Sequence, residues 1–203
     1  MIARRGQSQA AELLTKIARE VRSGVQLLSQ LLGTPDGERQ ALREELLSLE
    51  GNAMDLHFNL MTHMRSVFLT PLPRQDIYAL SQQLNRTMEH VVAAGDFIIA
   101  REHLKLAPPS SEQVETLSRQ VDLTIAALSR LDHFDQLEDY WIQMQRLAKQ
   151  ANRTHREWII STDSAFQPNI ALQQTEIAQA MLSAVEAQRT VAITAGSIIV
   201  RES

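Results

Sequence analysis

Histidine, serine and carboxylate side chains are the groups in this sequence that could carry out acid–base, nucleophilic or metal chemistry. His57 and His63 are separated by five residues, a spacing that does not place both on one helix face, and no His-Glu-x-x-His pattern occurs. No Gly-x-Ser-x-Gly turn and no glycine-rich phosphate loop is present. The chain has no cysteine and therefore no thiolate nucleophile or ligand. The motifs indicate no enzyme active site.

A proline-containing segment, with Thr70, Pro71, Arg74 and Asp76, carries the most specific local pattern. Pro71 and Pro73 favour extended backbone in the residues before them, which predicts a corner between two helices. Asp76 is suited to the positive end of the following helix, and Arg74 is expected to hydrogen-bond to neighbouring carbonyls. These residues are interpreted first as a structural corner.

The elements that hold this corner are long helices. Apolar residues recur at spacings of three and four, as in Leu14, Ile17, Val21 and Val25, and short clusters of glycine and proline interrupt the pattern. The clusters predict six helices, over about 8–32, 38–68, 74–104, 110–131, 136–161 and 169–200. Ser110 or Ser111 is expected to cap the fourth helix. We therefore predict an all-α domain, 1–203, of six long antiparallel helices in two three-helix halves, 1–107 and 108–203.

Composition narrows the classes of partner. The net charge is -4 and no basic face stands out, so we expect no nucleic-acid binding. No apolar run approaches the ~18 residues of a membrane span, so we expect no direct membrane insertion. The N-terminus lacks the apolar run of a secretory signal, and the absence of cysteine agrees with a cytoplasmic location.

The corner is similar to a signature of one protein family. Phe68, Thr70, Pro71, Arg74, Asp76, Ile77 and Leu80 match the pattern of PhoU-like regulators associated with Pit-type phosphate transporters. The resemblance implies a PhoU-like bundle that is not an enzyme and regulates inorganic phosphate transport by binding another protein. The implied partner is a Pit-type transporter or a signalling protein, which would hold the chain at the inner membrane. The resemblance leaves a homodimer open.

The resemblance also implies a place for a metal ion. Family members carry Glu-x-x-Ala-Asp on the second helix and Leu-Asp-x-x-x-Asp on the third, and here these positions are 50–54 and 84–89. Met54 replaces one carboxylate, and the remaining ligand set for a divalent or trivalent cation is Glu50, His57, Asn85 and Glu89. In the second half the corresponding stretches are 148–152 and roughly 183–188, where only Glu186 is acidic.

Two other functions stay open beside phosphate-transport regulation. Because most of the family's carboxylates are replaced, no cofactor is expected, but a metal-binding bundle that retains a weakened site is one alternative. A helical interaction protein that has lost the family's role is the other alternative.

Overall fold

The computed structural model describes residues 2–67, 70, 72–101, 103–131, 134–165 and 167–202. The described chain is helical and has no β-strand, so the predicted all-α class is confirmed. Its elements in chain order are α1 (Ile2–Gly33), the short 3-10 helix η1 (Asp36–Glu38), α2 (Arg39–Ser66), α3 (Arg74–Ile99), α4 (Pro109–Leu128), α5 (Phe134–Ala165) and α6 (Pro168–Glu202).

The predicted apolar stripes face the core. On α1, Leu14, Ile17, Val21 and Val25 are buried, as their spacing predicts. On α2 the buried strip is narrow: Leu42, Leu49 and Leu56 are only half-buried, and the buried members are Leu46, Ala53, Leu60 and Met64. α2 therefore covers the core from outside and leaves most of its surface exposed.

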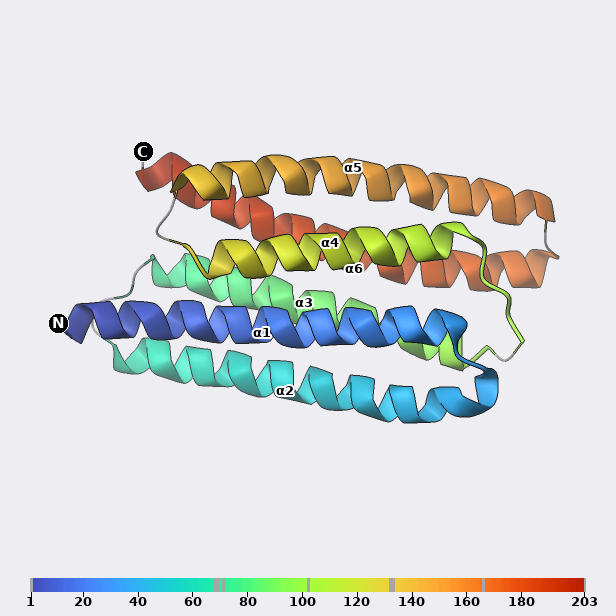
Figure 1. Ribbon diagram of the computed structural model, residues 1–203, viewed down its shortest axis with the longest axis horizontal. Coiled ribbons are helices and arrows are strands. Elements are labelled where there is room, and N and C mark those ends of the chain that lie inside the picture. Colours follow the sequence, from blue (N-terminus) through green and yellow to red (C-terminus); the bar gives the residue numbers. More distant parts are fainter. Residues whose placement is uncertain are drawn as a thin grey trace.

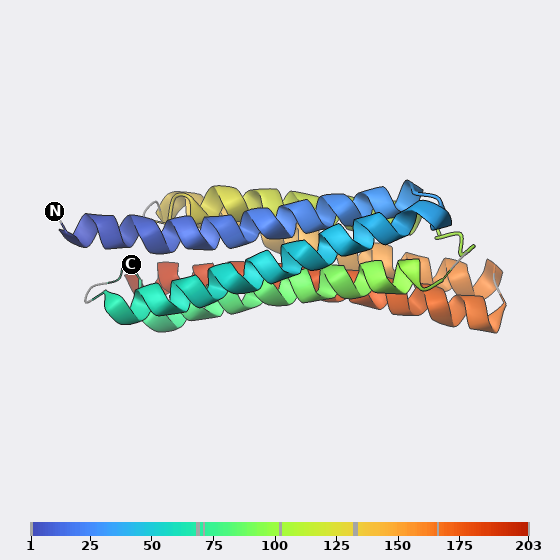
Figure 2. The ribbon, with the colours of Figure 1, turned by 90° about the horizontal axis from the view of Figure 1, so that it is seen from below.

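The six long helices run alternately in opposite directions (Figure 1). α1 to α3 pack on one another and α4 to α6 do the same. The halves meet where α1 packs on α4 and α3 packs on α6 (Figure 2), and α3 with α6 is the most extensive helix pair. α2 and α5 lie along opposite edges of the molecule (Figure 1). The buried apolar residues of both halves belong to one continuous core.

Two glycines allow helices to approach closely. A Cβ atom on Gly95 of α3 would lie 2.7 Å from Leu46 Cδ2 of α2, and one on Gly24 of α1 would lie 2.9 Å from Met88 Sδ of α3. These contacts are too short for a larger residue without movement of the neighbouring side chain. The missing side chains thus allow α1, α2 and α3 to pack tightly around Leu46 and Met88.

Helix boundaries differ from the sequence prediction in two places near the join between the halves. α3 ends at Ile99 rather than near Leu104. α4 begins at Pro109 with Pro108 as its N-cap residue, so the prediction of a Ser110 or Ser111 cap was wrong. Proline is favoured in the first turn because it lacks the N–H group that would have no partner there.

Within the described part of the chain, no helix is apolar over a length sufficient to cross a membrane.

Candidate functional site

A groove between α2 and α3 contains the residues implied as metal ligands. Glu50, His57, Asn85 and Glu89 all line it, and its volume is about 280 Å³. We call it the carboxylate groove; its other lining residues are Met54, Tyr78, Gln82, Arg86 and Met88. The sequence resemblance thus selected residues from two helices that the fold brings together.

Glu50 is destabilised as a carboxylate in this groove. Burial raises its pKa, and the negative charges of Glu89 and Asp96 raise the pKa further. Asp96 is itself paired, because Arg43 Nε donates to Asp96 Oδ1 at 2.7 Å. A cation placed between Glu50 and Glu89 would relieve the repulsion between these two carboxylates.

His57 is held by neighbouring groups on α3. Its Nδ1 atom lies 3.1 Å from Ser81 Oγ, and Ser81 Oγ donates its proton to Tyr78 O at 2.9 Å. Because that hydroxyl proton is already used, Nδ1–H of His57 is the donor to Ser81, and Nε2 keeps its lone pair in the neutral ring. Burial lowers the pKa of His57, which favours this neutral form.

The groove is nonetheless an incomplete metal site in this conformation. Among the described residues, no three His, Asp or Glu side chains are arranged so that they could hold one ion. Two carboxylates with repelling charges remain, together with the neutral side-chain oxygen of Asn85 and the ring of His57. Such a set fits a weakly held divalent cation that keeps several water ligands.

Hydrogen bonds from Arg74 and Thr70 hold the described part of the proline corner. Arg74 Nη2 donates to Val67 O at 2.8 Å, and Thr70 Oγ1 donates to Leu72 O at 2.7 Å. Asp76 lies in the first turn of α3 and is only 6% exposed. Arg201, in the last turn of α6, donates to Asp76 Oδ2 at 2.5 Å. The corner therefore also links the two halves. Pro71 and Phe68 lie outside the described residues.

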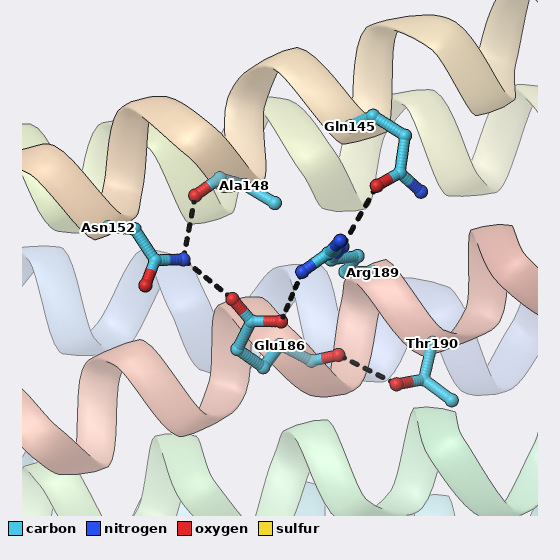
Figure 3. Close-up of polar contacts among 6 residues, drawn as sticks. All are labelled: Gln145, Ala148, Asn152, Glu186, Arg189 and Thr190. Atoms are coloured by element: carbon cyan, nitrogen blue, oxygen red, sulfur yellow. Dashed lines mark hydrogen bonds and ion pairs between the residues drawn. The ribbon is translucent and has the colours of Figure 1, made fainter.

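A second groove, between α5 and α6, is strongly cationic. Its volume is about 570 Å³, and its lining residues are Arg146, Lys149, Asn152, Arg153, Arg156, Glu186 and Arg189. We call it the basic groove. Asn152 Nδ2 donates to Glu186 Oε1 at 2.7 Å (Figure 3), so the two stretches that the family comparison aligned in the second half do meet.

The expectation that no basic face stands out was wrong. Arg146, Lys149, Arg153 and Arg156 follow one another at spacings of three, four and three, which places them along one face of α5. That spacing was a readable signal. The net charge of -4 does not show it, because the sum averages these cations with distant carboxylates.

Comparison with known proteins supports the fold assignment. No protein-family model matches the sequence, and no curated protein is similar to it. The crystal structure of a PhoU-like protein from Shewanella oneidensis MR-1 is similar, with a TM-score of 0.82 and 14% sequence identity. The likeness covers 95% of this chain and 99% of that chain. The chain thus has the fold of a PhoU-like protein along nearly its whole length.

We expect the variant Glu50→Gln to be more stable than the natural protein at pH 7 in chelator-treated buffer. The pKa of Glu50 in the folded state lies above its unfolded value, so stability falls as the pH rises from the unfolded pKa through the folded pKa, and the full penalty is present above it. Below the ordinary glutamate pKa, both states are protonated and the difference should vanish. Thermal unfolding between pH 4 and pH 8 measures this.

Glu45→Gln is the matched control, because Glu45 is an exposed carboxylate on the same helix and does not line the groove. The interpretation of Glu50 is contradicted if Glu50→Gln is no more stable than Glu45→Gln at pH 7, or if its advantage is the same at pH 4.

Proposed function

We propose that this chain is a non-enzymatic regulatory protein of inorganic phosphate transport, which acts by binding a Pit-type transporter. The whole-chain likeness to a PhoU-like protein supports the regulatory class. The match at Thr70, Arg74 and Asp76 to the signature of the Pit-associated branch supports the choice of transporter.

An exposed apolar stripe on α2 carries the proposal. Leu47, Met54 and Phe58 are 38%, 60% and 70% exposed, and their spacings of seven and four place them on one helix face. Isolated exposed apolar residues are common, but three in line on a helix at the edge of the molecule form a surface that a partner could cover. Burying a Phe side chain alone contributes about 1.5–3 kcal/mol.

Carboxylates flank the stripe on both sides, and Arg65 lies at its C-terminal end, seven residues after Phe58. Helical spacing places Glu44 and Asp55 on one side of it and Glu50 on the other. Cytoplasmic loops of membrane proteins carry an excess of lysine and arginine near the ends of their spans. An apolar segment flanked by such basic residues would therefore complement the stripe in both polarity and charge. This complementarity favours a membrane transporter as the partner.

Replacement of Phe58 by Asp tests the contact. We expect Phe58→Asp to weaken binding to the co-expressed Pit-type transporter in detergent by about tenfold or more, because a charge would replace a ring that the transporter covers in the complex. Affinity measured on immobilised transporter gives the result, together with phosphate uptake in cells that lack the chain. Leu172→Asp on α6 is the matched control, since Leu172 is 61% exposed and lies away from the stripe.

Three outcomes would contradict the proposal. Transporter binding could be absent, the two variants could weaken it equally, or deletion of the chain could leave phosphate uptake unchanged. A second copy of this chain covering the stripe would appear in sedimentation as a dimer that Phe58→Asp dissociates and Leu172→Asp does not. That result would identify the stripe as a dimer contact instead of a transporter contact.

The carboxylate groove favours a second candidate function, a metal-binding bundle. The observation is the convergence of Glu50, Glu89, His57 and Asn85 on one groove, with the pKa of Glu50 raised in part by Glu89. Mass spectrometry of protein purified without chelator and without a metal-binding tag is the test. Stoichiometric metal that falls in Glu50→Gln but persists in Glu45→Gln would support this candidate, and metal-free protein would contradict it.

A further inference from the structure

The basic groove contains more positive charge than its own carboxylate can balance. Five cationic side chains and one carboxylate line it, in a chain whose net charge is -4. Glu186 Oε2 accepts from Arg189 Nη1 at 3.3 Å, and Arg189 is the cation that this carboxylate pairs with. In the part of the chain that the structure describes, Arg146, Lys149, Arg153 and Arg156 form no ion pair.

A fixed hydrogen-bond network forms the wall beside these cations (Figure 3). Asn152 Nδ2 donates to Ala148 O at 2.9 Å and to Glu186 Oε1 at 2.7 Å, and Arg189 Nε donates to Gln145 Oε1 at 2.9 Å. Both oxygens of Glu186 are thus engaged, and Arg189 is held across α5 and α6. This wall, formed by Asn152, Glu186 and Arg189, is preorganised on two helices, and the exposed cations of α5 lie along its edge.

Repulsion among these cations opposes folding, and a bound anion would remove that cost. Like charges that share a helix face, three or four residues apart, repel each other and destabilise the helix. Lys149 and Arg153 are such a pair, as are Arg153 and Arg156. An anion bound along the row would relieve the repulsion and would use the guanidinium groups, whose planar forks match phosphoryl oxygens.

We propose that the basic groove binds a small anion with several phosphoryl groups in a chain. The row from Arg146 to Arg156 extends roughly 15 Å along α5, which is longer than one phosphate can span. The groove volume, about 570 Å³, is in the range of small-molecule sites. None of its lining residues is aromatic, so it offers no surface on which a nucleobase would stack. An oligophosphate fits it better than a nucleotide or nucleic acid does.

This site is separate from the apolar stripe and the carboxylate groove, and the proposal does not rest on transporter binding. α5 lies along the edge of the molecule opposite α2 (Figure 1). Isothermal titration of the full chain with orthophosphate, pyrophosphate and tripolyphosphate is the experiment. Affinity should rise along that series by about tenfold or more and fall with added salt, because each further phosphoryl group reaches another cation.

Lys149→Gln combined with Arg153→Gln should weaken tripolyphosphate binding by about tenfold or more. Arg19→Gln combined with Arg65→Gln is the matched control, since both arginines are exposed and lie outside the groove. The melting temperature of each variant without ligand is an independent readout. The groove variant should melt at the same or a higher temperature than the natural protein, and it should lose the rise that tripolyphosphate produces.

The proposal is overturned if tripolyphosphate does not bind or if the two double variants bind it equally. Equal affinity for citrate would show a general anion surface without phosphoryl preference and would overturn the proposal. Much tighter binding of a single-stranded oligonucleotide, or of phosphatidylglycerol vesicles, than of tripolyphosphate would identify nucleic acid or a membrane as the ligand and would also overturn it. ATP binding no tighter than tripolyphosphate would support it.

Discussion

The buried side chain of Gln188 joins four helices at the centre of the molecule. From α6, its Nε2 donates to Thr87 Oγ1 of α3 at 3.3 Å, and its Oε1 lies 2.8 Å from Thr124 Oγ1 of α4. Thr124 in turn lies 2.9 Å from the hydroxyl of Tyr140 on α5, whose pKa burial raises. A buried polar group without a partner costs about 1–3 kcal/mol, so these helices are constrained to one register.

That register determines where the two grooves lie. α3 and α6 form the most extensive contact between the halves, and each also forms one wall of a groove with the outer helix of its own half. The grooves therefore occupy corresponding positions in the two halves, yet their charges are opposite. Glu50 and Glu89 repel each other in the first, while Lys149 and Arg153 do so in the second. The shared architecture carries two different chemistries.

Much of the fold could be predicted from local patterns, since long stripes such as Leu14, Ile17, Val21 and Val25 have few alternatives to an amphipathic helix. Helix ends were less predictable. The end of α3 at Ile99 and the start of α4 at Pro109 depend on how the chain turns between the two halves. The sequence of either helix alone does not determine that turn. The residues of the carboxylate groove could be predicted because one family motif falls on Glu50 and a second falls on Asn85 and Glu89. The row of cations on α5 is readable from its spacing, whereas its placement beside Glu186 and Arg189 of α6 depends on tertiary packing.

The coupling of the halves through Gln188 is tested most directly by unfolding in guanidinium. Both tryptophans, Trp141 and Trp158, lie in the second half, so their fluorescence reports on it, while hydrogen exchange of amides in α1 to α3 reports on the first. We expect both probes to report one shared unfolding midpoint. Gln188→Leu should lower the free energy of unfolding measured by each probe by about 1–3 kcal/mol. A fluorescence midpoint that moves in Gln188→Leu while protection of α1 to α3 stays unchanged would contradict the coupling.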